Sequence, residues 1–227
     1  MALLGRAALA MWWDIAAELR ADFEDWHAHE HFPERLAIPG FRRGTRWSST
    51  AGGEGMFVLY ELEGHNTLAS PAYLARLDAP TPWSTRLMPH HRNMVRSQCH
   101  VVASRGGVIA RHAWSVRLSA VADRSAALQA YLGSLVATLP SRPGLVGAHL
   151  LRHEIPNIGT TREQQIRNNA DRSADWVLVA CGYAAPALEE LGRFELSPAQ
   201  LAEHGGAAEP VAALYSLAAS AVGSDIE

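Results

Sequence analysis

The sequence predicts an α+β protein in which one arrangement of strands and helices occurs twice. Strand-like and helix-like segments follow in the order β-α-β-β-α-β over residues 1–105, and the same order then begins again over residues 106–227. A Pro-Gly turn before a strand also occurs twice, at Pro39-Gly40 and, 104 residues later, at Pro143-Gly144. This order is that of the ferredoxin-like motif. We therefore expect two ferredoxin-like units related by a tandem duplication.

The apolar pattern and the turn signals of the first unit predict four strands and three helical segments. The strands are expected at 7–13, 41–49, 56–62 and 94–103, and the helices at 15–31, 71–77 and 82–89. A glycine-rich loop at 51–55 joins the second strand to the third. Asp14 is a suitable N-cap for the first helix, which should end near His31 because Pro33 cannot continue it far.

The second unit repeats this order with one additional segment. Its strands are expected at 108–118, 145–153, 176–183 and 210–219, and its helices at 120–139 and 186–193. The segment 154–175 has no counterpart in the first unit, and we expect it to be an exposed, mobile hairpin insertion. Its polar residues are Asn157, Gln164, Gln165, Asn168, Asn169 and Asp171.

Composition excludes several classes of function. The 227 residues are 48% hydrophobic and 19% charged, with a formal net charge of -3 and no basic run, so a nucleic-acid partner is not expected. All 20 cationic side chains are arginines, which excludes Schiff-base lysine chemistry. The apolar segment at the N-terminus is too short to cross a membrane. Cys99 and Cys181 lie in apolar strands and should be buried free thiols, so we expect a cytoplasmic protein.

Titratable side chains are most concentrated at the end of the first predicted helix. His27 and His31 are four residues apart and share a helix face, whereas His29 points to solvent. A neutral imidazole beside Glu30 can act as a general acid or base near pH 7. The alternative is that His31 only interacts with the carboxyl end of the helix dipole.

Short motifs around these histidines resemble a known family. His31-Phe32-Pro33 at a helix end and Pro39-Gly40-Phe41 at a strand start resemble the EthD-like branch of the dimeric α/β-barrel superfamily. Pro80-Thr81-Pro82-Trp83 and Met88-Pro89-His90 also resemble elements of that branch. The resemblance covers the first unit well and the second only in its fold pattern and its Pro-Gly turn. It implies that the two sheets pack face to face into an α/β barrel, closed within one chain or completed by a homodimer.

The resemblance also implies where the chemistry lies. The superfamily contains cofactor-free monooxygenases, lactone isomerases, polyketide cyclases and, in more distant branches, haem enzymes. His31 would be the catalytic acid or base at the mouth of the barrel, Glu30 would orient it, and His90 would be a second proton-transfer residue. Leu135 stands 104 residues after His31, so we expect the first unit alone to carry a site.

Residues near this helix end are expected to bind the substrate in an apolar barrel cavity. Alternation in the strand 94–103 puts Arg96, Gln98 and His100 on the face that we expect to line the cavity, and Val95 and Cys99 on the helix-covered face. A tryptophan at the mouth can stack on an aromatic ligand or pack in the core, and a histidine on an apolar strand face is more often a core residue. The predicted substrate-binding residues are His27, Arg46, Tyr60, Trp83, Arg96, His100, His112 and Trp114.

Together these features favour a cofactor-independent isomerase, cyclase or lyase of small-molecule metabolism that acts on a carbonyl, lactone or aromatic intermediate. No metal is expected, because the middle histidine of His27-x-His29-x-His31 points away from the outer pair and no zinc signature is present. The chain also lacks dinucleotide, P-loop and nucleophile-elbow motifs. The alternatives are a non-catalytic ligand-binding or stress-response barrel and a haem-dependent enzyme.

Overall fold

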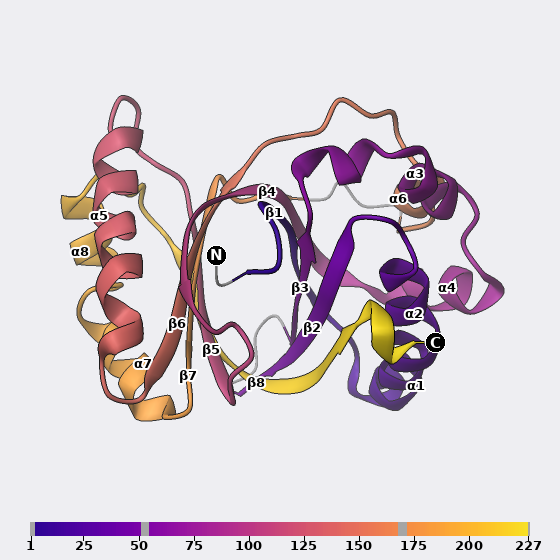
Figure 1. Ribbon diagram of the computed structural model, residues 1–227, viewed down its shortest axis with the longest axis horizontal. Helices are drawn as coiled ribbons and strands as arrows, with labels where there is room; N and C mark the ends of the chain where they lie inside the picture. The colour runs from indigo at the N-terminus through magenta and orange to yellow at the C-terminus, as the bar shows by residue number, and fades with distance from the viewer. Residues whose placement is uncertain (1–2, 51–54, 168–171, 227) are drawn as a thin grey trace.

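The computed structural model describes residues 3–50, 55–167 and 172–226, and these form a closed antiparallel barrel of eight strands flanked by helices (Figure 1). The strands of the first unit are β1 (Ala7–Asp14), β2 (Phe41–Ser49), β3 (Met56–Leu62) and β4 (Arg92–Gly106). Those of the second unit are β5 (His112–Leu118), β6 (Leu145–His153), β7 (Trp176–Gly182) and β8 (Val211–Val222).

Helical segments connect these strands. Those between β1 and β4 are η1 (Ala17–Leu19), α1 (Arg20–Trp26), η2 (His27–His31), α2 (Phe32–Leu36), η3 (His65–Ala69), α3 (Pro71–Asp78), α4 (Pro82–Leu87) and η4 (Met88–His90). Those after β5 are α5 (Ser125–Thr138), η5 (Leu139–Ser141), α6 (Arg162–Arg167), α7 (Ala185–Arg193), α8 (Pro198–Glu203) and η6 (Gly223–Asp225). The segment η2 is a π-helical turn. No helix in the described residues is long and apolar enough to span a membrane.

The strand order is that of two ferredoxin-like sheets joined at their edges. The first sheet runs β4-β1-β3-β2 and the second β8-β5-β7-β6. The edge strand β2 pairs with β8, and the equivalent edge β6 pairs with β4. Because both joints pair edges of the same chain, the described barrel has no free strand edge that would need a second chain. The predicted α+β barrel of two ferredoxin-like units is confirmed.

The two Pro-Gly turns have the same structural role. Gly40 and Gly144 have φ angles of 94° and 87°, a region that favours glycine. The carbonyl oxygen of Gly40 accepts a hydrogen bond from the backbone N–H of Glu63 (2.8 Å), and that of Gly144 accepts one from Tyr183 (3.0 Å). Both turns therefore anchor the start of a strand to the end of its neighbour. A tandem duplication as the origin of this similarity stays a prediction.

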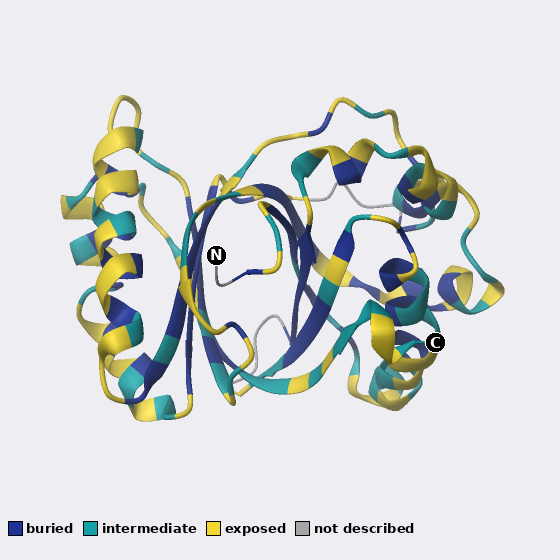
Figure 2. Ribbon diagram, in the orientation of Figure 1, coloured by how far each residue is buried: buried dark blue, intermediate teal, exposed yellow. Residues whose placement is uncertain are grey.

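The inside of the barrel is a packed core. Trp12 stacks on Phe57 with ring centroids 4.9 Å apart, and Phe57 stacks on Trp47 at 5.0 Å. The guanidinium of Arg117 lies 4.8 Å from the ring centroid of Trp12. All eight strands contribute buried residues to this core, and Figure 2 shows most of the strands buried along much of their length, whereas β8 is mainly half-buried or exposed. The prediction of an apolar cavity inside the barrel is therefore wrong, because aromatic side chains fill that space.

Two helical layers cover the outside of the barrel on opposite sides (Figure 1). The layer of α5, α7 and α8 packs on the second unit with a core rich in leucine. The layer of α1 to α4 packs on the first unit with a core rich in aromatic residues. Although α6 follows β6 in the chain, it lies against α3 in the layer of the first unit.

The first helix does not end at His31 as predicted. Helical backbone continues through the π turn of η2 and through α2 to Leu36. Pro33 lies in the first turn of α2, directly after the π turn. Asp14 is not an N-cap, because it ends β1 and its Oδ1 accepts a hydrogen bond from the backbone N–H of Gly55 (2.5 Å).

The segment 154–175 is exposed along much of its length but has buried residues as well, and its predicted origin as a mobile insertion stays a prediction. It contains α6, and Thr161, Glu163 and Arg167 are buried. Further on, the backbone oxygen of Arg172 accepts a hydrogen bond from Arg96 in β4 (2.8 Å). Of the polar residues named above, Asn157 and Gln165 are exposed and Gln164 is half-buried, and those outside the described residues are Asn168, Asn169 and Asp171.

The two cysteines are confirmed as buried free thiols. Burial raises the pKa of the Cys181 thiol to about 12 and also raises the pKa of Cys99. Neither thiol is therefore a nucleophile near neutral pH.

Candidate active site

A closed cavity of about 40 Å³ lies outside the barrel, between the helical layer of the first unit and the outer face of β1, β3 and β4. This volume holds about three water molecules. Its apolar walls are Leu9, Met11, Trp13, Trp26, Met88 and Met94. Its polar walls are His27, His31, Arg35, Tyr60, Tyr73, His91, Arg96, Glu163 and Arg167.

The π-helical turn η2 presents two of these histidines. His27 and His31 are both buried, with 1% and 6% of their surface exposed. The ring of His27 packs on that of Phe32 with centroids 4.3 Å apart, and the ring of His31 packs on that of Trp26 at 4.4 Å. Single π-helical turns inside helices are rare and occur frequently at functional sites.

Several polar atoms of the cavity have no hydrogen-bond partner. They are both ring nitrogens of His27, Nδ1 of His31, Nε2 of His91, the hydroxyl of Tyr60 and Nη1 of Arg35, and all of them are buried. A buried polar group without a partner costs about 1–3 kcal/mol, and native structures contain few such groups. Their convergence on one cavity is therefore typical of a site that receives a polar ligand.

Burial keeps the three imidazoles neutral. It lowers the pKa of His27 and of His31 well below the ordinary value, with further lowering by Arg46 for His27 and by Arg35 for His31. Burial, with Arg167 and His90 as weaker causes, lowers the pKa of His91 to about 3. The same effect raises the pKa of the Tyr60 hydroxyl. At pH 7 the site therefore offers neutral, weakly basic imidazoles that can accept hydrogen bonds and a protonated tyrosine that can donate one.

The charged residues of the cavity make it electropositive. Arg35 forms a buried ion pair with Glu163, and Nη1 of Arg167 lies 3.9 Å from the same carboxylate. Nη2 of Arg96 donates a hydrogen bond to the hydroxyl of Tyr73 (2.8 Å). With neutral histidines, three arginines and one glutamate leave the lining with a net charge of +2. Such a site favours a ligand that carries or develops negative charge.

Four of the predicted site residues line this cavity: His27, His31, Tyr60 and Arg96. Arg46 is buried beside it, where Nη1 donates a hydrogen bond to the backbone oxygen of Glu24 (3.2 Å).

Glu30 and Trp83 do not face the cavity. Oε1 of Glu30 accepts hydrogen bonds from Nε1 of Trp26 (3.0 Å) and from the hydroxyl of Thr81 (2.5 Å), so Glu30 holds Trp26 rather than His31. Nε1 of Trp83 donates a hydrogen bond to Asp22 (2.9 Å), and the ring packs against the core of the first unit.

His90 is exposed, and its neighbour His91 occupies the cavity instead. The short turn η4 ends at His90, and the chain then enters β4 with the ring of His91 5.2 Å from that of Trp13. The choice of His90 rested on a motif resemblance, and no spacing in the sequence separates the two histidines.

The two faces of β4 are the reverse of the prediction. Met94 and Arg96 face the helical layer and the cavity, whereas Val95 and Cys99 belong to the packed inside of the barrel. Both faces are buried, so alternation alone could not tell which one lies inside.

The remaining predicted residues lie elsewhere. His100 is exposed near the end of β4 that pairs with β6. Trp114 belongs to the core under the helices of the second unit, and His112 on the same strand β5 has its Nδ1 3.2 Å from the hydroxyl of Ser216. Neither His112 nor Trp114 can contact a ligand in the cavity of the first unit.

Sequence reasoning missed Arg35, His91, Glu163 and Arg167. Arg35 follows His31 at the same four-residue spacing that joins His27 to His31, so the helix face contained a signal for it. Glu163 and Arg167 come from a segment whose polarity predicts exposure, and no local signal indicated their burial.

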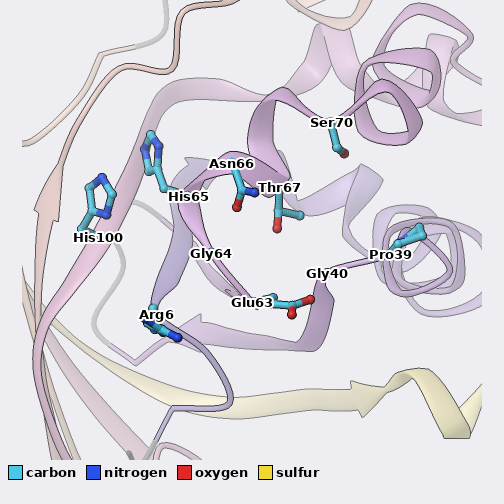
Figure 3. A pocket seen from close by; sticks show the side chains of 10 residues that line it. All are labelled: Arg6, Pro39, Gly40, Glu63, Gly64, His65, Asn66, Thr67, Ser70 and His100. Carbon is cyan, nitrogen blue, oxygen red and sulfur yellow. The ribbon is translucent and has the colours of Figure 1, made fainter.

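A second depression lies at the start of η3 (Figure 3). It is an open groove of about 620 Å³ with a polar lining that includes Arg6, Glu63, His65 and His100. Most of these side chains are at least partly exposed, so the groove lacks the desolvated groups that distinguish the closed cavity.

Comparison with known proteins supports the fold. No protein-family model matches this chain, and no curated protein sequence matches it. Its structure is similar to that of an anthrone oxidase-like protein, with 13% identity, 97% of this chain and 94% of that chain covered, and a TM-score of 0.64. A proposed monooxygenase from Fusobacterium nucleatum follows, with 8% identity, 96% and 95% coverage and a TM-score of 0.61. A proposed chlorite dismutase has 12% identity, 98% coverage of both chains and a TM-score of 0.52.

Identities this low show the fold alone. The matched structures share the barrel fold of this chain over nearly its whole length. Membership of the dimeric α/β-barrel superfamily and of its EthD-like branch stays a prediction, whereas the fold that the resemblance implied is confirmed.

Proposed function

We propose that this protein is a cofactor-independent enzyme that transfers protons on a small organic substrate in the closed cavity of the first unit. The observation that carries this proposal is the convergence of unpaired polar atoms from His27, His31, His91 and Tyr60 on one desolvated space. Among the described residues, the helical layer of the second unit has one such atom, Nε1 of Trp114. Folding alone does not require these polar groups, so we assign them to the chemistry.

His31 is the proposed general base and acid. Its Nδ1 is unpaired and its neutral imidazole can take a proton from a carbon beside a carbonyl group. The enolate that forms carries its charge on oxygen, where the hydroxyl of Tyr60 and Nη1 of Arg35 can each donate a hydrogen bond. Return of the proton to another carbon completes an isomerisation, and loss of a leaving group or attack on a second carbonyl gives elimination or cyclisation.

The other predicted residues receive revised roles in this proposal. Glu30 becomes a positioning residue that holds Trp26 against His31. His91 takes the place of His90 as the second proton-transfer candidate, and His27 binds the substrate. Arg96 adds positive charge that favours a carbonyl, lactone or phenolic substrate able to become an anion.

The closed cavity limits what can bind without movement. Pockets for organic ligands usually measure roughly 300–1,000 Å³, whereas this one measures about 40 Å³. Any substrate larger than a few water molecules therefore displaces part of the cover. Glu163 and Arg167 on α6 form that cover together with the ion pair to Arg35.

Haem, which the distant branches of the superfamily suggest, does not fit this cavity. The imidazoles of His27 and His31 are suitable axial ligands, since they have unpaired ring nitrogens. A haem is a rigid macrocycle much larger than a small ketone or lactone, so it would have to displace far more of the cover than the proposed substrates do, since pockets for large organic ligands measure up to roughly 1,000 Å³. We derive no step through haem.

The test is proton exchange in D₂O. Purified protein is incubated with a panel of small ketones, lactones and phenolic acids, and deuterium incorporation is followed by mass spectrometry, with a visible absorption spectrum of the same sample. We expect exchange or turnover of at least one substrate and no Soret band. Binding of a panel member without exchange or turnover would indicate a ligand-binding barrel, and a Soret band would indicate a haem protein.

A further inference from the structure

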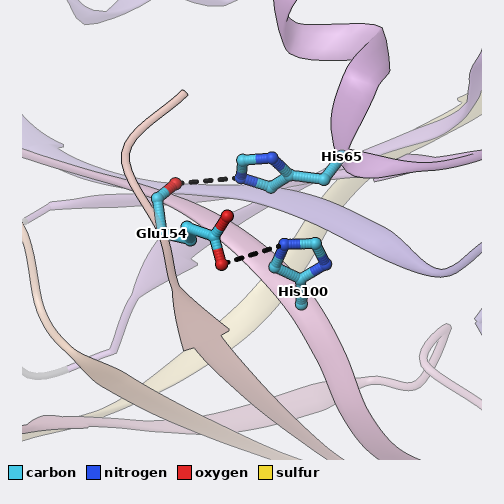
Figure 4. Close-up of side chains that lie close together, drawn as sticks. All are labelled: His65, His100 and Glu154. Atoms are coloured by element: carbon cyan, nitrogen blue, oxygen red, sulfur yellow. Dashed lines mark hydrogen bonds and ion pairs between the residues drawn. The ribbon is translucent and has the colours of Figure 1, made fainter. Parts of the chain in front are cut away.

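Three potential metal ligands meet on the surface, away from the closed cavity. His65 lies in η3, His100 in β4, and Glu154 directly follows β6, so they come from both units (Figure 4). One ligand atom of each residue lies within 4.8 Å of a ligand atom of the other two, and no other set of three or more has this geometry among the described residues. The histidines around the closed cavity are not arranged in this way.

The three side chains already interact. Nε2 of His100 lies 3.4 Å from Oε2 of Glu154, and Nε2 of His65 lies 2.9 Å from the backbone oxygen of Glu154. The imidazole rings of His65 and His100 stack with centroids 4.3 Å apart and planes 16° apart. Figure 4 shows the carboxylate beside the two rings, with one of its oxygens directed at His100.

The backbone holds these residues in place. His100 pairs with Arg152 in the joint between β4 and β6. The backbone N–H of Glu154 donates a hydrogen bond to the backbone oxygen of Gln98 (2.8 Å). Only side-chain rotation is therefore needed to bring the ligand atoms closer, and the exposed positions of His100 and Glu154 leave room for it.

We propose that His65, His100 and Glu154 bind a divalent transition-metal ion of the Zn²⁺ type. Two imidazoles and one carboxylate are a common ligand set for zinc, with bonds of about 2.0–2.2 Å that place tetrahedral ligands about 3.4 Å apart. The His100 and Glu154 ligand atoms already have this separation. His65 exchanges its hydrogen bond to the backbone of Glu154 for the bond to the metal.

The ligand chemistry selects the ion. Imidazole nitrogen suits zinc, nickel and copper, whereas magnesium and calcium prefer oxygen ligands alone. Three protein ligands leave a fourth position for water or another ligand. His65 and His100 also line the open groove of about 620 Å³ (Figure 3), so this position is accessible from solvent.

Metal binding has a structural consequence that does not depend on the proposed function. It would join η3 and β4 of the first unit to the chain segment that begins at Glu154 and continues into α6. The site thus adds a crosslink between the two units at the surface.

The proposal is tested by isothermal titration calorimetry. The full chain is first stripped of metal with EDTA, and ZnSO₄ is then titrated into it. We expect one Zn²⁺ per chain and, with MgCl₂, no binding heat. His100→Ala and Glu154→Gln should each weaken the affinity by at least about tenfold, since metal affinity depends steeply on each ligand. His29→Ala and His90→Ala remove exposed histidines outside the cluster and should bind zinc like the parent protein.

Because His100 and Glu154 are exposed, we expect both variants to fold like the parent protein, and circular dichroism of each variant checks this. Absence of stoichiometric zinc binding by the parent protein would overturn the proposal. Zinc binding by folded His100→Ala with unchanged affinity, or equal weakening by the two control substitutions, would do so as well.

Discussion

The two helical layers of this barrel cover equivalent sheets but bury different chemistry. Under the helices of the first unit lie three neutral histidines, two tyrosines and a buried Arg35–Glu163 ion pair. Under those of the second unit lie mainly aliphatic side chains, among them Leu128, Leu132 and Leu135. Leu135 stands where the repeat of the Pro-Gly turn places the counterpart of His31.

This difference distinguishes the side chains that are enough to stabilise the fold from those that the fold tolerates at a cost in stability. The leucine layer shows that apolar packing alone is enough to cover such a sheet, since burial of a leucine side chain contributes about 1.5–3 kcal/mol. The histidine layer has the same strand order beneath it but contains unpaired polar atoms that each cost stability. A layer that is costly to fold and rich in proton acceptors is where we expect function.

The largest effect should come from the proposed catalytic histidine. His31→Ala should lower turnover, or proton exchange in D₂O, by roughly 10²- to 10⁴-fold, the usual contribution of a positioned acid or base. His29→Ala is the matched control, because His29 is exposed and its Nδ1 lies 3.0 Å from the backbone oxygen of Asp25, one turn earlier in the same helical segment. Equal rates for the two variants would contradict the role of His31.

Next in size is the effect of breaking the buried ion pair. Glu163→Gln leaves the buried guanidinium of Arg35 without a countercharge and should lower the free energy of unfolding by about 3–5 kcal/mol. In the second unit the pair Arg142–Glu195 is partly exposed, and Glu195→Gln should cost about 0–1 kcal/mol. Urea unfolding of both variants measures this contrast, and equal costs would show that the burial of the first pair is unimportant.

A reciprocal exchange between the layers should have a smaller effect. Leu135→His puts a polar ring among leucines without a partner and should lower the free energy of unfolding by about 1–3 kcal/mol. His31→Leu removes an unpaired polar group and should leave that free energy unchanged or raise it by about 1 kcal/mol, while activity is lost. Urea unfolding and the exchange assay together measure the two outcomes. A marked destabilisation by His31→Leu would make the histidine structural.

The last predicted effect is the dependence of stability on acid, measured over a span of two pH units. The folded pKa of His91, about 3, lies below its ordinary value of 6.5, so the unfolded chain binds the proton more readily. The stabilisation is complete above pH 6.5 and is lost as pH falls from 6.5 towards 3, by about 1.4 kcal/mol per pH unit.

Unfolding of the parent protein and of His91→Gln at several pH values between 5 and 7 isolates this contribution. The variant should show a shallower loss below pH 6.5. His27 and His31, whose pKa values burial also lowers, add to the slope in both proteins, and so does His149 inside the barrel. Identical slopes for parent and variant would contradict a neutral, buried His91.

Local patterns predicted most of the secondary structure. The strands at 41–49, 56–62 and 145–153 have the predicted bounds, because alternation and turn residues are local properties of the chain. The prediction that the first helix ends near His31 was wrong, since the π-helical turn places Pro33 in the first turn of α2 and the helix continues to Leu36. The additional helices α6 and α8 were not predicted, although Ser197-Pro198 at the start of α8 matches the Thr81-Pro82 start of α4, a helix of the same length that was predicted.

The candidate site was predicted in part for the same reason. The spacing of His27 and His31 is local, and it correctly placed both on one face of a helix. His91 and Glu163 join them only through the path of the chain, and the metal cluster of His65, His100 and Glu154 joins segments far apart in the sequence. Sequence distance contains no information about such contacts.

The sequence by itself determined the order of the elements, the two Pro-Gly turns and which residues of each strand share a face. Only the tertiary structure decided that Arg96 lies under the helices and Val95 inside the barrel, because a strand buried on both sides has apolar residues on both faces. It also decided that α6 of the second unit covers the site of the first. There Glu163 supplies a countercharge to Arg35, a long-range attraction that no local pattern encodes.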